Sequence, residues 1–466
     1  MLAAAVLVLG ASACGDSEPG SQPHMPAPRD PVATVAPALP PAPATRVRVV
    51  DGDTGKAVAS ARVVFSREGA SSEADRRGVA DLGVPRRRIR VHVAAPGYSA
   101  RDVRVDFRRR LVHEVDLWRP ALQWPLYGAN PARTQVHPAI KLRPPFRALW
   151  TRSLGGLVEF PAVVWDGVAY VNNIHGWLRA ISMRNGHVLW QRRVGTLTAS
   201  SPGLDPKRGL LVTPSMSPGY VSVVSMETGH VRWRLYTGRA EPSPVIRDGI
   251  AYFAAANGNV YALDLDRRRP RWVFHGGVKI TSSPALVGKR LYVGDYAGRV
   301  FALNARTGRL LWTGSAGSRV YGTVAVAGGR VFAPSVFSGL SALSARTGRL
   351  RWRIPVSAYL YSSPAVYRGR VYFGTYAGAV SCASARTGRI IWSRPAGGAV
   401  SGAVQVVAGV VYAASMGSRT TAWDWRTGRT LWTFPHGRYV PVSGNGARLL
   451  MHGGGRVWAV VPKKRR

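Results

Sequence analysis

A nine-residue motif that ends in tryptophan recurs through the chain and limits its fold more than any other feature. It reads NARTGRLLW at residues 304–312, and near copies occupy residues 344–352, 384–392 and 424–432. Tryptophans in the same phase are Trp150, Trp190, Trp233, Trp272, Trp312, Trp352, Trp392 and Trp432, at spacings of 39 to 43 residues. A period near 40 with alternating, strand-type patterning between turns predicts the four-stranded blades of a β-propeller. Helical repeats of this length would need 3.6-residue periodicity, which is absent.

Residues 282–312 illustrate one predicted blade. They contain four strand-like runs separated by turns, among them the tight turn at Ala297–Gly298 and the turn at Thr307–Gly308. Gly308 allows a positive φ at no steric cost, and the short polar Asn304 can cap the turn. We expect Trp312 to pack between neighbouring blades. The motif is therefore interpreted as structural, with no chemistry of its own.

Eight in-phase tryptophans predict eight blades. Residues 440–461 end before a fourth strand, whereas residues 147–155 (RALWTRSLG) supply a strand that has no blade before it. Pairing of these two segments would close the ring and remove two exposed sheet edges.

The repeats resemble a known family. The SSPA stretches, the hairpins DYAGRVFAL, TYAGAVSCA and ANGNVYALD, and the ARTGRxxW turns are similar to those of pyrroloquinoline-quinone-like (PQQ-like) eight-bladed propellers. The resemblance covers residues 121–466. It implies an all-β fold, and it leaves activity open because the family includes quinoprotein dehydrogenases as well as non-catalytic outer-membrane assembly lipoproteins.

The N-terminal region predicts export. Residues 1–14 combine an apolar run with Ala11-Ser12-Ala13-Cys14, which resembles a bacterial lipobox and implies lipidation of Cys14. The first lipobox position is Ala rather than Leu, and no basic residue precedes the run, so a plain cleaved signal peptide is the alternative. Residues 15–45 are rich in proline and alanine, as expected of an extended linker.

Residues 46–120 alternate with period two between turn signals, which predicts a small β-sandwich before the propeller. The stretches VVDGDTGKAVASARVVF, DRRGVADLGVP and VHVAAPGYSARDV resemble the carboxypeptidase regulatory-like, transthyretin-related domain. We expect positive φ at Gly55, Gly78 and Gly97. The resemblance implies a spacer or adhesive module without catalytic residues.

Quinone-dependent oxidation requires acidic residues and calcium at the centre of such a ring, and often a vicinal disulfide. Cys14 and Cys382 cannot form that disulfide, and Cys382 lies in a strand pattern typical of a buried, inert thiol. Of the ten acidic residues in 121–466, Glu159, Glu241 and Asp295 are expected on the face where the loops before the inner strands converge. This set is sparse for a hard cation, so no cofactor and no metal are expected. His175 and His452, predicted on comparable loops of blades 1 and 8, are interpreted as polar loop residues.

Positive charge is the other prominent feature. The chain carries a formal net charge of +41, and residues 121–466 hold 46 Lys and Arg against ten Asp and Glu. Arginines recur at the motif turn, which predicts a ring of them on one face: Arg306, Arg309, Arg346, Arg349, Arg386, Arg389, Arg426 and Arg429. Two explanations stay open: a genome that favours arginine on solvated surfaces, or attraction to an anionic envelope polymer or membrane.

Eight residues form the candidate ligand-binding site. By their phase in blades 4 to 6 they should surround one sector of the propeller mouth: Tyr296, Tyr321, Phe337, Tyr359, Tyr361, Tyr376, Lys279 and Arg319. Clustered aromatics beside cations suit peptide or glycan contacts, whereas packing of the funnel wall is the alternative.

These features together predict an exported, lipid-anchored, non-enzymatic propeller. Its expected partner is an envelope protein, peptide or anionic cell-wall polymer; nucleic acid is not expected, and we expect a monomer. The alternatives are a quinoprotein dehydrogenase and a binder of anionic polymer through the basic surface.

Overall fold

The computed structural model describes residues 44–65 and 69–463. Cys14 and the predicted signal segment, together with nearly all of the predicted linker, lie outside the described residues. Within these ranges the fold is almost entirely β, and the one helical element is the 3₁₀ turn η1 (Pro120–Leu122). No helix in these ranges is long and apolar enough to cross a membrane.

Residues 46–117 form two small sheets, as the period-two pattern predicts. Their strands are β1 (Arg46–Asp51), β2 (Arg62–Val64), β3 (Ser71–Glu73), β4 (Val79–Asp81), β5 (Arg88–Ala94), β6 (Arg101–Asp106) and β7 (Val112–Leu117). The orders are β4-β1-β7 and β3-β2-β5-β6. Alternate residues such as Val47, Val63, Val91 and Val105 meet in one core. The expected positive φ at the three turn glycines is confirmed, at 71°, 77° and 79°.

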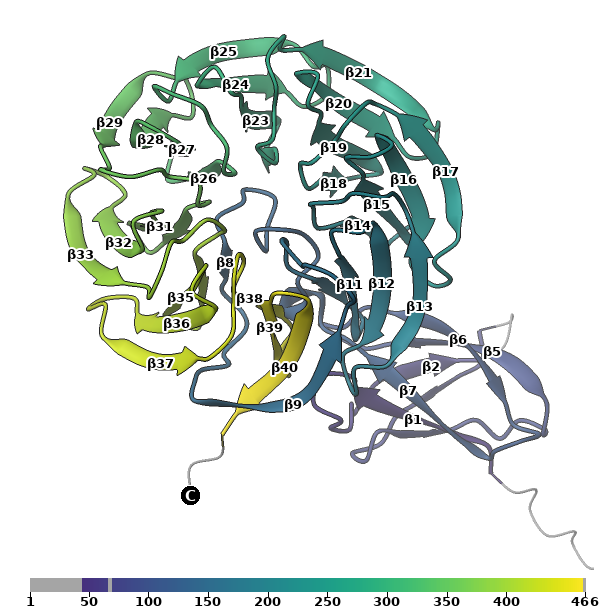
Figure 1. Cartoon of the computed structure of the whole chain (residues 1–466). Coiled ribbons are helices and arrows are strands. Elements are labelled where there is room, and N and C mark those ends of the chain that lie inside the picture. The colour runs from purple at the N-terminus through teal and green to yellow at the C-terminus, as the bar shows by residue number, and fades with distance from the viewer. Residues whose placement is uncertain (1–43, 66–68, 464–466) are drawn as a thin grey trace, which may run out of the picture. The chain divides into compact units, whose positions relative to one another are not determined.

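Eight sheets follow and are arranged as the blades of a propeller, with the first strand of each blade innermost (Figure 1). Seven of them have four strands, and the sheet of blade 7 has a fifth, β8 (Val136–His137). Blades 1 to 4 consist of β10 (Val163–Trp165), β11 (Val168–Asn172), β12 (Trp177–Ser182) and β13 (Val188–Arg193); β14 (Gly203–Asp205), β15 (Leu210–Pro214), β16 (Tyr220–Ser225) and β17 (Val231–Tyr236); β18 (Val245–Arg247), β19 (Ile250–Ala254), β20 (Asn259–Asp264) and β21 (Arg269–His275); and β22 (Ala285–Val287), β23 (Arg290–Gly294), β24 (Arg299–Asn304) and β25 (Leu310–Ser315).

Blades 5 to 8 consist of β26 (Ala325–Ala327), β27 (Arg330–Ser335), β28 (Gly339–Ser344) and β29 (Leu350–Ile354); β30 (Ala365–Tyr367), β31 (Arg370–Gly374), β32 (Ala379–Ser384) and β33 (Ile390–Pro395); β34 (Gln405–Val407), β35 (Val410–Ser415), β36 (Arg419–Asp424) and β37 (Thr430–Phe434); and β38 (Val442–Gly444), β39 (Leu449–Gly453), β40 (Arg456–Pro462) and β9 (Phe146–Ser153). The eight-bladed prediction is confirmed.

The predicted ring closure is also confirmed. Strand β9, which precedes blade 1 in the chain, pairs antiparallel with β40 of blade 8, with Trp150 opposite Ala459. Blade 8 therefore has three strands from the end of the chain and one from before blade 1. The closure joins residues about 300 positions apart and covers the edge of β40 within blade 8.

In six of the eight blades the recurring tryptophan donates a hydrogen bond to the next blade. Trp312 Nε1 in blade 4 donates a hydrogen bond to the carbonyl of Ala345 in blade 5, at 3.2 Å. Gly348, in the motif turn of blade 5, has φ +75°, and a Cβ built on it would lie 2.5 Å from the Trp312 ring. Glycine is thus required twice, by the left-handed backbone and by the close approach of the ring. The same hydrogen bond and contact recur between Trp352 and the turn of blade 6.

A segment before the ring lies among the inner strands of the blades, which the sequence analysis did not anticipate (Figure 1). The carbonyls of Pro131, Ala132, Thr134 and Gln135 accept hydrogen bonds from the inner strands of blades 4, 5, 6 and 7 in turn: from Leu286, Val326, Val366 and Val406, all at 2.8 to 2.9 Å. Its short strand β8 (Val136–His137) pairs parallel with β34. Residues 124–137, hereafter the plug, therefore satisfy backbone groups that a channel would leave exposed.

Arg133 holds the plug in place. Its fully buried guanidinium donates to the carbonyls of Pro284 at 3.0 Å and Ser243 at 2.7 Å, and also to the carbonyl of Tyr127. Burial lowers the pKa of Arg133 to about 9, so the group stays protonated at neutral pH. Three carbonyl dipoles, rather than a carboxylate, compensate this buried charge within the described residues.

Candidate functional site

Antiparallel strands give the ring two distinct ends. In blade 4 the loop that carries Lys279 precedes β22, and the hairpin that carries Tyr296 joins β23 to β24, so both lie at one end. The motif turn at residues 305–309 joins β24 to β25 and lies at the opposite end. The end with the loops before the inner strands is called the mouth below.

All eight residues of the predicted ligand site are brought together at the mouth. The ring centroids of Tyr321 and Tyr361 are 5.3 Å apart, and those of Tyr361 and Tyr376 are 5.4 Å apart. Tyr359 contacts Tyr361 at 5.8 Å, Tyr376 at 6.2 Å and Phe337 at 5.5 Å. The aromatic residues thus form one continuous cluster over blades 4 to 6.

The two predicted cations join this cluster through Tyr296. Lys279 Nζ and Arg319 Cζ each lie 4.8 Å from the centroid of the Tyr296 ring, and Tyr296 contacts Tyr321 at 6.4 Å. Arg319 also lies 6.0 Å from the ring of Phe337. Cation–π contacts of this kind hold the basic side chains at the rim of the mouth.

Solvent exposure separates the cluster into two levels. Phe337, Tyr359 and Tyr376 are 60%, 47% and 42% exposed, whereas Tyr321 and Tyr361 are partly buried beneath them. Large exposed rings beside cations are uncommon on a surface with no partner. The upper level, hereafter the rim, consists of these three rings with Tyr296, Lys279 and Arg319; packing of the funnel wall and contact with a ligand both remain open for it.

Below the rim lies a small cavity, hereafter the cup, with a free volume of about 50 Å³. Tyr127 of the plug belongs to its lining, so the cup is closed at the bottom. The other lining residues are Glu159, Phe160, Glu241, Thr281, Tyr321, Gly322, Thr323, Tyr361, Ser363, Ser401, Gly402, Tyr439 and Val440. Such a volume accommodates a few water molecules or one small polar group.

A chain of hydroxyl groups surrounds the cup floor and explains the SSPA stretches. The backbone N–H of Ser201 donates to Ser243 Oγ, that of Ser243 to Ser283 Oγ, and that of Thr323 to Ser363 Oγ, each at 2.9 Å. The backbone N–H of Ser283 completes the series by donating to Thr323 Oγ1 at 3.3 Å. A hydroxyl at one position of each inner-strand loop therefore links blades 2 to 6 side by side.

Glu159 and Glu241 both line the cup, as their phase predicted. Tyr321 Oη lies 3.5 Å from Glu241 Oε1, and no ion pair of either glutamate occurs within the described ranges. Burial raises the pKa of both carboxyls above the ordinary value. The charge of Glu159 raises the pKa of Glu241 further, and Lys279 partly offsets this rise. At Glu159, Arg438 partly offsets the rise in pKa.

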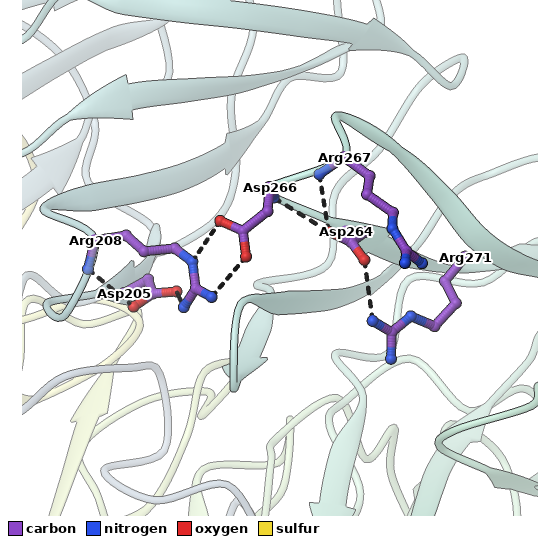
Figure 2. Close-up of polar contacts among 6 residues, drawn as sticks. All are labelled: Asp205, Arg208, Asp264, Asp266, Arg267 and Arg271. Carbon is purple, nitrogen blue, oxygen red and sulfur yellow. Dashed lines mark hydrogen bonds and ion pairs between the residues drawn. The ribbon is translucent and has the colours of Figure 1, made fainter.

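The third predicted acid, Asp295, is not available to a ligand. It is fully buried in its hairpin, where it pairs with Arg299 at 2.6 Å and accepts hydrogen bonds from the backbone N–H groups of Ala297 and Arg299. Other acidic residues are similarly engaged. Figure 2 shows Arg208 bridging Asp205 and Asp266, with Asp264 paired to Arg271 nearby.

The expectation of a polar loop residue is confirmed for His175 and was wrong for His452. His175 is exposed in a hairpin, but His452 lies buried within β39, where its Nε2 accepts a hydrogen bond from the backbone N–H of Ala162 at 3.1 Å. Burial lowers the pKa of His452 to about 4. His452 pairs with Val457 of β40, so it belongs to the sheet of blade 8 rather than to a loop. Cys382 is buried in β32, as expected of an inert thiol.

Comparison with known proteins now decides the family. The family model described as outer membrane protein assembly factor BamB matches residues 147–278, 174–320, 256–359, 306–378 and 337–464, in overlapping repeats that span all eight blades. The chain belongs to this family. No curated protein matches the chain.

Solved structures agree with this propeller family in fold. BamB from Moraxella catarrhalis aligns with a TM-score of 0.59 at 16% identity, covering 69% of this chain and 99% of that one. The computationally designed Ika8 protein aligns at 0.59 and 16%, covering 67% and 98%. Quinohemoprotein alcohol dehydrogenase from Comamonas testosteroni aligns at 0.63 and 14%, covering 74% and 81%. At such identities the likeness concerns the fold alone.

The residues at the centre of the ring do not fit the quinone that some relatives of this fold carry. Pockets for ligands of that size are typically about 300–1,000 Å³, far larger than the cup. Glu159 and Glu241 are the acidic residues that line the cup, and the described part of the chain contains no group of three His, Cys, Asp or Glu side chains that could hold a metal.

The sequence analysis missed the part of the cup that lies outside blades 4 to 6. Tyr127, Phe160 and Tyr439 all line the cavity, and Tyr127 contacts Phe160 at 5.2 Å. Phe160 and Tyr439 occupy positions in the loops before the inner strands, and their phase could have identified them. Tyr127 belongs to the plug, whose non-periodic sequence carries no indication that it enters the ring.

The predicted arginine ring lies at the end opposite the mouth. All eight side chains at the motif turns are exposed, and none of the ion pairs within residues 44–65 and 69–463 involves them. The turns themselves are held by the residue before them; in blade 7, Asp424 accepts hydrogen bonds from the backbone N–H groups of Arg426 and Thr427, both at 2.9 Å.

Proposed function

We propose that the protein is an exported, lipid-anchored, non-enzymatic propeller that binds a partner in the cell envelope through the rim of its mouth. The single observation that carries the proposal is the exposed aromatic cluster with two cations held against it by Tyr296. Large amphipathic rings contribute contact area at low entropic cost, and basic side chains add directional contacts.

The family supports a binding role. Its description names an outer membrane protein assembly factor, and the relatives of known structure include BamB. The small cup and its two carboxyl groups disfavour the alternative of a quinoprotein dehydrogenase. That alternative predicts alcohol-dependent dye reduction after reconstitution with quinone and calcium, and the proposed function predicts none above background.

The N-terminal region completes the proposal. Lipidation of Cys14 would anchor the mature chain, and residues 15–45 would act as the extended linker. Residues 46–120 would serve as a carboxypeptidase regulatory-like spacer. We propose these boundaries from the sequence.

The rim is tested by substituting two exposed tyrosines. Tyr359→Ala with Tyr376→Ala should weaken capture of the partner from envelope extract by roughly 2 kcal/mol or more, as the loss of aromatic anchors does. Tyr236→Ala is the control, since Tyr236 is 67% exposed on the outer strand of blade 2. Unchanged capture by the double variant, with an unchanged melting temperature, would reduce these rings to wall packing.

A second candidate function rests on the arginine ring. Eight exposed arginines without ion pairs at one end of the ring favour attraction to an anionic cell-wall polymer. Because the arginines and the rim are at opposite ends, substitutions can separate the two functions.

A further inference from the structure

The cup combines two features that a role of the rim in partner binding does not use. One is a wall of aromatic rings, and the other is a pair of carboxyl groups. Both line the same cavity, below the exposed tyrosines.

The aromatic wall surrounds the cavity on several sides. Tyr321 and Tyr361 enter from blades 5 and 6, Phe160 from blade 1, and Tyr439 from blade 8, while Tyr127 rises from the plug. Tyr321 and Tyr361 contact edge to face at 5.3 Å, and Tyr127 and Phe160 do so at 5.2 Å. Aromatic walls of this kind attract organic cations through the negative faces of their rings.

The carboxyl groups supply charge that the protein leaves uncompensated at short range. Within the described residues Glu159 makes neither a hydrogen bond nor an ion pair, and Glu241 has only the 3.5 Å contact with Tyr321 Oη. Lys279, the basic residue that acts most on Glu241, holds its ammonium against the Tyr296 ring instead. Partly desolvated carboxylates without partners are costly unless a ligand pairs with them.

We propose that the cup binds the tip of one basic side chain, lysine or arginine, presented by the partner polypeptide. The free volume of about 50 Å³ admits one ammonium or guanidinium group and excludes a larger ligand. The aromatic walls favour such an organic cation over calcium, which takes six to eight oxygen ligands.

The charge around the cup defines the partner segment further. Lys279 and Arg319 stand at the rim above the two glutamates, and the chain as a whole has a net charge of +41. A uniformly basic segment would be repelled on approach. The fitting segment is therefore acidic overall, with a single lysine or arginine that enters the cup while its acidic neighbours meet the rim cations. This inference deepens the proposed function and rests on it for the identity of the partner as a polypeptide.

The experiment uses small probes and the full chain, so that it does not depend on the partner. Nα-acetyl-arginine amide and Nα-acetyl-citrulline amide have nearly the same shape, but only the first is charged. Saturation-transfer NMR titrations should show the arginine amide binding about tenfold more tightly, as expected of one charge-assisted hydrogen bond gained. Glu159→Gln with Glu241→Gln should abolish that preference.

A charge-matched control variant separates the effect of the cup carboxylates from that of the protein's overall charge. Glu227→Gln with Asp248→Asn removes two exposed carboxylates from turns outside the cup and should leave the preference unchanged. The cup variant should melt no lower than the parent, because each glutamine removes a desolvated charge. Equal binding of the two amides by the parent, no binding of either, or a preference retained in the cup variant would overturn the inference.

The pH dependence of probe binding provides an independent test of the cup. The charged groups that act on the two carboxyls are Lys279, Arg239 and Arg438, and Glu159 also acts on Glu241. Because burial raises the pKa of both, binding of the arginine amide should strengthen as pH rises through that raised range, and the citrulline amide should show no change. If the probes do not bind as expected but the tyrosine variants still lose the partner, the rim binds the partner and the cup does not take part.

Discussion

The hydroxyl of Tyr127 donates a hydrogen bond to Ser363 Oγ at 2.9 Å across 236 positions of the chain. The same oxygen accepts the backbone N–H of Thr323, also at 2.9 Å. One serine therefore joins the plug, blade 5 and blade 6 at the floor of the cup. The plug is bound to the ring by specific contacts and does not merely occupy its channel.

Removing Ser363 Oγ should lower the free energy of unfolding more than removing the Tyr127 hydroxyl. Ser363→Ala leaves two buried donors unpaired, and we expect a loss of about 2–4 kcal/mol in the free energy of unfolding. Tyr127→Phe leaves the Thr323 bond intact and should cost about 1 kcal/mol. Urea denaturation of both variants measures the difference. Equal losses would show that the two bonds at Ser363 are not both formed.

The contact between the motif glycine of one blade and the tryptophan of the blade before it is tested by a matched pair of glycine-to-alanine variants. Gly348 and Gly369 both have φ +75°, but a Cβ at Gly348 would lie 2.5 Å from the Trp312 ring, whereas nothing lies within 4 Å of one at Gly369. Gly369→Ala should cost about 1–2 kcal/mol for the left-handed backbone, and Gly348→Ala about 2 kcal/mol more for displacing the indole. Denaturation midpoints that fall by the same amount would remove the proposed role of Trp312.

His452 predicts a loss of stability in acid. Its pKa is about 4 in the folded protein and about 6.5 when unfolded, so the unfolded chain binds more protons between these values. Stability should therefore fall as pH drops from 6.5 to 4, by up to about 3 kcal/mol from this residue. Asp53 acts in the opposite direction, because burial raises its pKa to about 7 and protonation then favours the folded state.

Because these two groups oppose each other, the effect of His452 is read from a variant. His452→Gln keeps an acceptor for the Ala162 N–H without titrating. The stability difference between parent and variant should shrink as pH falls from 6.5 to 4, measured by urea denaturation at each pH. A difference independent of pH would mean that His452 titrates normally.

Anchoring is tested at Cys14. If this cysteine is lipidated, Cys14→Ala should move the protein from the membrane fraction to the soluble exported fraction, because an acyl chain contributes about 0.8 kcal/mol of membrane affinity for each buried CH₂. Cys382→Ala is the control, since that thiol is buried in blade 6. Fractionation that is unchanged by Cys14→Ala would rule out the lipoprotein assignment.

The arginine ring predicts binding that depends on salt. Arg309→Ser with Arg349→Ser should weaken binding to poly-L-glutamate several-fold, and binding by the parent should fall steeply above 0.1 M salt, where charges are screened over about 10 Å. Arg309→Lys with Arg349→Lys keeps the charge and should bind nearly as the parent does. Affinity that is the same in all three proteins would assign the exposed arginines to general solvation.

The sequence by itself determined the propeller, because each blade is specified locally. The period-two strands, the glycine at each motif turn and the tryptophan after it recur at a nearly constant spacing along the chain. The strand at residues 147–155, which has no blade before it, indicated how the ring closes. The mouth cluster followed from the same phase, since Tyr321 and Tyr361 occupy equivalent positions in adjacent blades.

Only the tertiary structure decided which of these residues remain free and what lies between the blades. Glu241 and Asp295 look alike in the sequence, yet Arg299 neutralises Asp295 while Glu241 faces the cup. The buried His452 accepts a hydrogen bond from Ala162, 290 positions away, and backbone hydrogen bonds join the plug to four separate blades. These outcomes depend on contacts between segments up to about 300 residues apart, which local periodicity does not encode.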